Sequence, residues 1–503
     1  MGQEQKKLRC HFSIIFESLW KFWVVIAILL INEIEVIIDI IQEIGKDGIM
    51  AFLETGGVWG LVILLAITLI VFGIQFFRWR KTWIILEDNL VIIERNTLKK
   101  VKNTIAIENI SAVNMERNLF ERIVGTYRIK MDTNSMTTAN ETDVSIVFRE
   151  DVAIKFRKTV LERMHKLKGN VDTEALSEER QPDELTSVSA GDRKVFHYSP
   201  LDMLKHSFYS MPIFGLLVSI GGVGGMIWYI SEFGWYSFIN EALGGLIAVV
   251  IMVVSSIYSI VKNFFKYYDF TVYRDGKDLH IKCGLIKLRS YTIPVDKITA
   301  LTIDQPVISR LCGKYQVEVT TVGVADEDGE NSNLTMAISK EECLAHLEEL
   351  VPEYYWDGIL DYNKEEKGGA MVRVVKSIKW HIMVIAAMIL LFTLAEAPWY
   401  VAILGPLAFD LFICALYVLS HKTAGYKITE EGLVLVNGYF AKHISLVKYK
   451  KAQVLTMTYH PAAKRYDIGD GVIMLLNSAV SVPYIKKDLA SEISDKIIGG
   501  TTK

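Results

Sequence analysis

The sequence has few cysteines and histidines, and none of them forms a recognisable motif. The five cysteines include no CxxC pair, and the ten histidines show no HExxH or His–x–His spacing. Zinc sites need clustered ligands, and disulfide frameworks belong to oxidising compartments. The sequence therefore predicts free thiols in a reducing compartment, no metal site and no cofactor. The cysteines are Cys10, Cys283, Cys312, Cys343 and Cys414.

Catalytic and nucleic-acid signals are missing as well. No GxSxG motif, Walker A loop or strand-coupled GxGxxG occurs, so no residue is assigned a catalytic role. The 55 Lys and Arg residues are balanced by 58 Asp and Glu residues, whereas nucleic-acid binding needs a basic excess. We therefore expect neither an enzyme nor a nucleic-acid partner.

The sequence does have long apolar runs. Hydrophobic residues make up 51% of the chain, charged residues 22%, and the mean hydropathy is +0.27. A membrane-spanning helix needs roughly 20 apolar residues. Six segments qualify, and they form three close pairs: 13–32 with 58–77, 207–230 with 243–261, and 380–396 with 399–419.

The charges beside these segments predict their orientation. Basic residues such as Arg78, Arg80 and Lys422 flank the outer ends of the pairs, whereas Lys46 is the one cation in the connections inside the pairs. Cytoplasmic loops carry the excess of Lys and Arg. We therefore expect a multi-pass plasma-membrane protein with both termini and all three polar regions in the cytoplasm.

The polar regions resemble one another. Each opens with two short alternating runs, at 83–93, 270–281 and 426–436, which are typical of a strand hairpin. A residue that tolerates positive φ follows each hairpin: Asn96, Gly284 and Gly438. Apolar residues at helical spacing close each region, and Ser339 with Glu342 predicts a capping box for the second closing helix.

Two stretches within these regions are similar to each other in sequence. Residues 107–131 and 295–319 align without a gap, and the shared positions include an arginine, a glycine and a tyrosine. They are Arg122, Gly125 and Tyr127 in the first stretch and Arg310, Gly313 and Tyr315 in the second. We interpret the glycines as tight turns between strands and the arginines as structural pairs or edge contacts. A third copy is more diverged, with Ala452 and Gln453 in place of Ile298 and Thr299, and it needs an insertion that brings Gly469 into register.

The predicted fold is a polytopic α-helical membrane protein with six spans in three hairpins and three cytoplasmic β-rich domains, each closed by a C-terminal helix. Ser199 and Pro200 form an N-cap and N1 pair that predicts a helix running into the second hairpin. The predicted parts are hairpin 13–77, domain 78–169, linker 170–195, hairpin 199–261, domain 262–352, hairpin 372–419 and domain 420–498.

The hairpin sequence YKITEEGLVLVNGYF and the core IPVDKIT with RLCG resemble the second type of bacterial pleckstrin-homology (PH) domain. Their repetition behind paired apolar helices is similar to the YdbT-type membrane proteins of Gram-positive bacteria. The resemblance implies PH-like domains of about seven strands with one end plugged by the helix. It also implies a smaller homologous membrane partner, with one hairpin and one such domain, and no established catalytic residues.

Three further sets of residues are candidates for function. Asp410 lies near the middle of the sixth apolar segment, where an ionised carboxylate is costly. It is either a proton or cation relay, or a buried hydrogen bond to another helix in this chain or in a partner subunit. Gly221 and Gly225 in SIGGVGG are one turn apart and predict a close helix crossing, with a flexible gating element as the alternative.

Basic clusters form the third set. They either bind anionic lipid or lie on a solvated edge near the bilayer. They are Lys99, Lys100 and Lys102; Lys287 and Arg289; and Lys448, Lys450 and Lys451.

Our first hypothesis for the function is a non-enzymatic scaffold. Its PH-like domains would assemble a complex with the smaller relative, or with a second copy of the chain, in envelope maintenance or resistance to membrane-active peptides. The alternative is a transporter or lipid-handling protein gated by those domains. The ligand, any transported species and the stoichiometry are not predicted.

Overall fold

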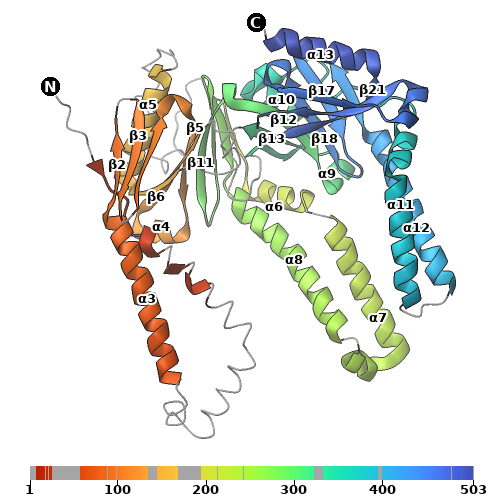
Figure 1. The fold of residues 1–503 in the computed structure, drawn as a ribbon, viewed down its shortest axis with the longest axis horizontal. Helices are drawn as coiled ribbons and strands as arrows, with labels where there is room; N and C mark the ends of the chain where they lie inside the picture. Colours follow the sequence, from red (N-terminus) through yellow and green to blue (C-terminus); the bar gives the residue numbers. More distant parts are fainter. Residues whose placement is uncertain are drawn as a thin grey trace. The chain divides into compact units, whose positions relative to one another are not determined.

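The structure is a computed structural model, and its parts are shown in Figure 1. The residues that it describes are 7–16, 19–20, 22–24, 26, 57–87, 89–97, 99–133, 144–167, 194–211, 213–241, 243–321, 332–394, 399–476 and 478–501. Half of the first predicted span, 13–32, and most of the predicted linker, 170–195, lie outside them. The chain divides into two compact units, residues 1–131 with 144–189 and residues 132–143 with 190–503, and each is described by itself.

The first polar region folds into two sheets and a closing helix. Apolar residues of both sheets and of the helix share one core that includes Ile84, Ile110, Phe148 and Phe156. The first sheet consists of β1 (Lys7–Leu8), β2 (Thr82–Leu86), β3 (Leu90–Asn96) and β4 (Lys100–Ala106). The strands β5 (Ile110–Arg117), β6 (Thr126–Thr133) and β7 (Val144–Arg149) follow in the second sheet, and α5 (Glu150–Leu167) closes the domain.

The second and third polar regions repeat this order of elements. The second has β8 (Val195–His197), β9 (Thr271–Asp275), β10 (Asp278–Cys283), β11 (Leu288–Pro294), β12 (Ile298–Gln305), β13 (Tyr315–Thr321), β14 (Ser332–Ile338) and α10 (Lys340–Leu350). The third has β15 (Asn363–Lys364), β16 (Gly425–Ile428), β17 (Gly432–Asn437), β18 (Lys442–Lys448), β19 (Val454–Thr458), β20 (Ile468–Met474), β21 (Ala479–Lys486) and α13 (Lys487–Thr501). The expected seven strands and closing helix are therefore present in each domain, and the capping box of Ser339 and Glu342 is present at α10.

A short strand before each apolar pair pairs with the strand that follows it. β1 pairs with β2, β8 with β9, and β15 with β16. The sequence did not predict these strands because two or three residues are too few to show a period. The second and third domains therefore include residues before their apolar hairpins, namely β8 at the end of the predicted linker and β15 before the third hairpin.

Long apolar helices lie between these strands. They are α3 (Gly57–Arg80), α7 (Ile213–Glu241), α8 (Leu243–Tyr267), α11 (Gly369–Leu394) and α12 (Trp399–Thr423). Among the described residues, three ranges are long and apolar enough to cross a membrane: Val62–Arg80, Gly369–Leu394 and Ala402–Thr423. In Figure 1, α7 and α8 lie side by side, as do α11 and α12.

The start of the second hairpin differs from the prediction. Ser199 does cap a helix with Pro200 at its first position, and Asp202 completes a capping box. That helix, α6 (Pro200–Tyr209), ends before α7 begins at Ile213, so it does not run into the hairpin.

A Cβ atom added to Gly221 or Gly225 would meet nothing within 4 Å among the described residues, so the close helix crossing expected there stays a prediction. Gly215 faces α8, and its added Cβ would lie 3.7 Å from Ser256 Oγ.

The shared glycines do form turns, but each turn follows a short helix that the sequence did not predict. Gly125 (φ 73°) ends α4 (Leu119–Val124), and Gly313 (φ 63°) follows α9 (Val307–Leu311). In the third domain Asp467 (φ 48°) takes this place after the 3₁₀ helix η7 (Pro461–Tyr466). The expected insertion before Gly469 is therefore wrong, because Asp tolerates the left-handed conformation and can replace Gly.

Gly469 instead occupies the position of the shared tyrosines. In the first domain Arg117 Nη1 donates to Tyr127 Oη at 3.2 Å. In the third domain the Tyr459 ring fills the corresponding space, since a Cβ on Gly469 would lie 2.7 Å from it.

One sheet continues from the second domain into the third. Its strand order is β14-β13-β12-β18-β17-β16-β15, with β12 antiparallel to β18 from Leu301↔Leu446 to Gln305↔Lys442 (Figure 1). We call this contact the β12–β18 joint. It places two successive domains edge to edge within one compact unit.

Candidate functional site

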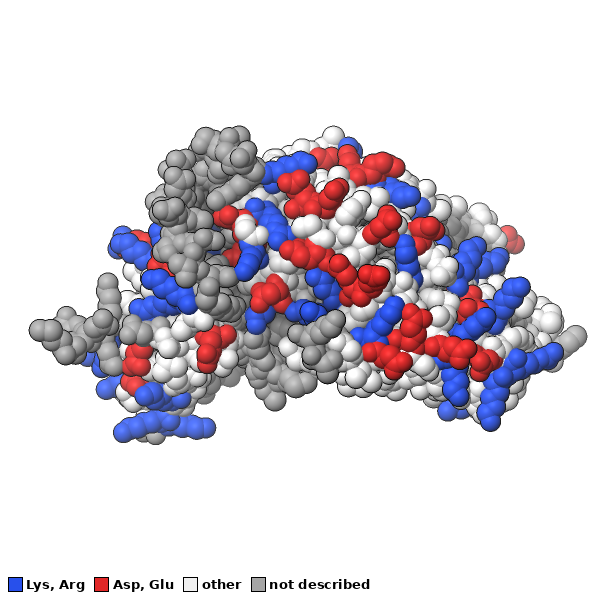
Figure 2. Space-filling view, turned by 90° about the horizontal axis from the view of Figure 1, so that it is seen from above, with Lys and Arg blue, Asp and Glu red and all other residues white. Residues whose placement is uncertain are grey.

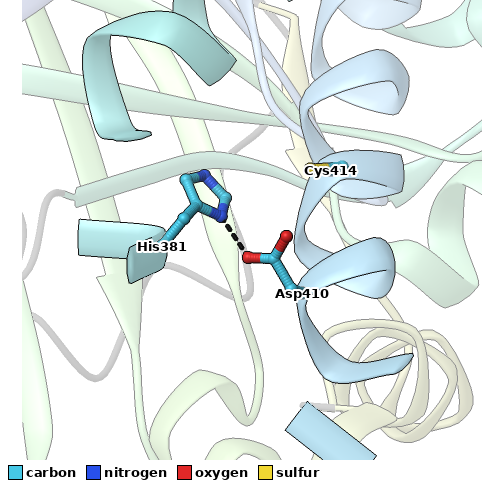
Figure 3. A group of neighbouring side chains, drawn as sticks. All are labelled: His381, Asp410 and Cys414. Atoms are coloured by element: carbon cyan, nitrogen blue, oxygen red, sulfur yellow. Dashed lines mark hydrogen bonds and ion pairs between the residues drawn. The ribbon is translucent and has the colours of Figure 1, made fainter. Parts of the chain in front are cut away.

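The third apolar hairpin brings Asp410 against a histidine. α11 and α12 pack closely, and a Cβ added to Gly405 would lie 3.4 Å from the Phe392 ring. His381 Nδ1 on α11 hydrogen-bonds to Asp410 Oδ1 on α12, as Figure 3 shows. The His381 side chain is 10% exposed and that of Asp410 26%. A polar partner reduces the cost of a carboxylate at membrane depth.

Further polar groups surround this pair. Ser377 Oγ lies 3.0 Å from His381 Nε2, and the Tyr417 ring meets the imidazole edge to face at 5.8 Å. Cys414 follows Asp410 by one helical turn. The ligand atoms of His381, Asp410 and Cys414 all lie within 4.8 Å of one another.

These three side chains are donors that transition metals use. In a tetrahedral zinc site with bonds of about 2.0–2.3 Å, the ligand atoms lie about 3.3–3.8 Å apart. The 4.8 Å that bounds this group is wider than that spacing, so a metal would require its side chains to move closer. The group was not expected, since the sequence predicted no metal site.

His381 was missed because it is 29 residues from Asp410, with no shared motif. If the apolar segments 380–396 and 399–419 are drawn as a helical hairpin, His381 and Asp410 come to a similar depth in the membrane. The interpretation of Asp410 as a hydrogen-bonded group on a helix hairpin fits this geometry. Its partner is in the same chain, and a relay role stays a prediction.

A second buried cluster lies where this hairpin meets the third domain. The Glu365 side chain is 0% exposed, and its carboxylate accepts hydrogen bonds from both terminal nitrogens of Arg373. It also contacts His421 Nδ1 at 2.6 Å and accepts from Tyr484 N at 2.9 Å. One carboxylate therefore ties α11, α12 and β21 together. The sequence gives no local sign of this role, because Glu365 lies in a run of charged residues.

The basic candidates form two groups, which lie at opposite ends of the strands of the first sheet in each domain. The turns after β3, β10 and β17 lie at the ends of α3, α8 and α12, since Asn96 N donates to Lys81 O and Gly284 N donates to Tyr268 O. Asn96 itself does not have positive φ, unlike Gly284 and Gly438. The candidates beside these turns are Lys99, Lys100, Lys102, Lys287 and Arg289. Binding of anionic lipid by them stays a prediction.

The third basic cluster is not near the apolar helices. Lys448, Lys450 and Lys451 lie at the end of β18 opposite the turn beside α12. Lys448 stacks 4.2 Å over the Tyr354 ring, Lys451 donates to Asp296 O, and burial lowers the pKa of both lysines. Lys448 and Lys451 thus contact residues of the second domain, and binding of anionic lipid by this cluster stays a prediction.

Figure 2 shows one face of the molecule, on which acidic and basic side chains are interspersed. Over the coloured residues of that face, neither sign of charge gathers into a large patch.

Comparison with known proteins explains the three repeats. The family model described as bacterial PH domain matches residues 26–164, 216–351 and 372–500. The chain is also 24% identical over 398 residues to the UPF0699 transmembrane protein YdbT of Bacillus subtilis (strain 168), covering 76% of each chain. No solved structure matches. The three matched ranges each combine apolar helix with the two-sheet domain that follows it, and the chain is a transmembrane protein that belongs to the bacterial PH domain family.

Proposed function

We propose that this protein is a non-enzymatic, multi-pass scaffold of the plasma membrane. Six spans form three hairpins, and the termini and the three PH-like domains are cytoplasmic. The domains assemble a complex with a smaller homologous membrane protein. Envelope maintenance or resistance to membrane-active peptides is the process we propose for this complex.

The β12–β18 joint is the observation that carries this proposal. Leu301 and Ile303 of β12 and Ile444 and Leu446 of β18 are all 0% exposed. Burial of apolar side chains between strands is the main source of stability in such a contact. Two PH-like domains thus bind each other through sheet edges, which is a protein–protein contact and not a ligand cleft.

Polar contacts flank the joint on both sides. His443 Nδ1 and Asp304 Oδ1 are 2.5 Å apart, and Arg310 Nη1 donates to Tyr439 O and Phe440 O at 3.1 Å each. Trp356 Nε1 donates to Glu431 Oε2 at 3.2 Å. The shared arginine of the second domain therefore acts as an edge contact, one of the two roles expected for it.

The paired short strands support the proposed topology. Each apolar hairpin begins after β1, β8 or β15 and returns to the neighbouring strand of the same sheet. A chain that leaves and re-enters one sheet must cross a membrane an even number of times. The basic last turns of α3, α8 and α12 support a cytoplasmic position for the domains.

Purification tests the scaffold proposal. The tagged full chain, extracted from its native membrane in mild detergent, is expected to retain a smaller membrane protein that carries one hairpin and one PH-like domain. Mass spectrometry identifies it, and an unrelated tagged multi-pass protein is the control. Recovery of a lone monomer at native expression would contradict the proposal.

A transport or lipid-handling role is the second candidate, and the polar cluster of His381, Asp410 and Cys414 favours it. We expect Asp410→Asn to lower proton or lipid flux in proteoliposomes at least about tenfold if the cluster is a relay. Thr393→Val is the matched control, because Thr393 lies on the same helix as His381 and its Oγ1 donates to Ile389 O of that helix. If Asp410→Asn leaves the flux unchanged, the pair of His381 and Asp410 is a structural contact and not a relay.

A further inference from the structure

The third domain has a strand, β19, that is equivalent to β12 and could form a second joint of the same kind. Placing the 3₁₀ helix η6 (Tyr449–Lys451) on η4 (Val295–Lys297) aligns β19 with β12 without a gap. Leu455 then takes the position of Leu301, and Met457 that of Ile303. β19 is thus the third domain's equivalent of the strand that binds β18.

One edge of β19 is open in the part of the chain that the structure describes. β19 pairs with β20 from Val454↔Met474 to Thr458↔Asp470. Within the described ranges, no strand pairs with its other edge. The strand sequence VLTMT has no charge and no proline, which are the usual means of protecting an edge.

The core of the third domain is incomplete beside this edge. Leu455 and Met457 pack against that core but are only partly buried, whereas Leu301 and Ile303 are 0% exposed. Val454 is 53% exposed, and Ala300, at the equivalent position, is 1% exposed. A neighbouring strand is what buries these positions in the second domain.

The first domain's equivalent of β18 fits this edge poorly. The first domain's β4 has Lys102 and Thr104 where β18 has Ile444 and Leu446. Pairing β4 of a second copy with β19 would set Lys102, which forms an ion pair with Glu94 at 3.7 Å, against the apolar side chain of Met457. Lysine on an edge strand opposes strand addition.

We propose that the open edge of β19 binds the third strand of the first sheet of a PH-like domain in a different membrane protein. That strand carries apolar side chains at the positions of Ile444 and Leu446, which complete the burial of Leu455 and Met457. Lys464, exposed at the position of Arg310, faces the carbonyls of the partner's strand turn. This inference rests on the proposed scaffold function and names its contact surface.

The test uses the full-length tagged chain in its native membrane. A photo-crosslinking amino acid in place of the exposed Thr456 is expected to crosslink a smaller PH-domain protein, identified by mass spectrometry. Met457→Lys is expected to lower its co-purification by about tenfold or more. Met474→Lys, on β20 and 47% exposed, is the matched control and should retain the partner.

The outcomes separate the two proposals. If the partner co-purifies but neither crosslinks at position 456 nor is lost in Met457→Lys, the edge inference is wrong and the scaffold function stands. Crosslinking to a second copy of this chain overturns the choice of partner. If no partner co-purifies with the wild type, the scaffold function itself fails. Because Thr456 is exposed, its crosslink decides the result even if Met457→Lys unfolds the domain.

Discussion

Gly284 and Gly276 differ in how much space surrounds them, which affects how well each position tolerates a side chain. Both are in the first sheet of the second domain and both have positive φ, 108° and 57°. A Cβ on Gly284 would lie 2.0 Å from Lys287 O, whereas a Cβ on Gly276 would meet nothing within 4 Å. The sequence predicted the turn at Gly284 but not this lack of space.

We therefore expect Gly284→Ala to lower the free energy of unfolding of the second domain by about 3 kcal/mol, and Gly276→Ala by about 1 kcal/mol. Pulse proteolysis of the purified full chain in denaturant measures both variants. Equal losses would show that the close contact at Gly284 relaxes without cost.

At the scale of elements, α6 is held to the second domain by a buried histidine. His206 is 1% exposed, its Nδ1 accepts from Ala337 N at 3.2 Å, and its ring meets Tyr267 edge to face. Burial, and then the charge of Lys266, lower the pKa of His206 from 6.5 to about 4. The folded protein therefore keeps this histidine neutral at pH values where the unfolded chain protonates it.

The contact of α6 should weaken in acid. Its stabilisation is complete above about pH 6.5 and is lost as the pH falls toward 4, at about 1.4 kcal/mol per unit. We expect a loss of about 2 kcal/mol between pH 7.5 and pH 5, seen as faster hydrogen exchange in α6. His206→Asn should flatten this dependence, and His197→Asn, an exposed control, should not. If the stability of the α6 contact still falls steeply with pH in His206→Asn, another titrating group is responsible.

At the scale of the whole molecule, each hairpin returns to the sheet it left. Alkaline phosphatase fused after Lys46 or Pro398 is expected to be active, because these connections lie outside the cytoplasm in the proposed topology. Fusions after Leu167 or Leu350 should be inactive. An active fusion after Leu350 would contradict the shared cytoplasmic side of the domains.

Local signals in the sequence determined the elements and their repetition. Apolar runs, the caps at Ser199 and Ser339, and the shared glycines fix nearby backbone, so they can be recognised from a few neighbouring residues. They predicted three β-rich domains with closing helices. They did not predict the short strands before each hairpin or the replacement of glycine by Asp467.

Only the tertiary structure decided the contacts between distant residues. The pairing of His381 with Asp410, the burial of Glu365 and the β12–β18 joint join segments with no common period or motif. Such contacts depend on how complete elements pack, and a sequence repeat specifies the element without specifying its neighbour. The repeat thus determined that β12 and β19 are equivalent strands, and packing alone decided that one is covered by β18 while the other's edge is open in the described structure.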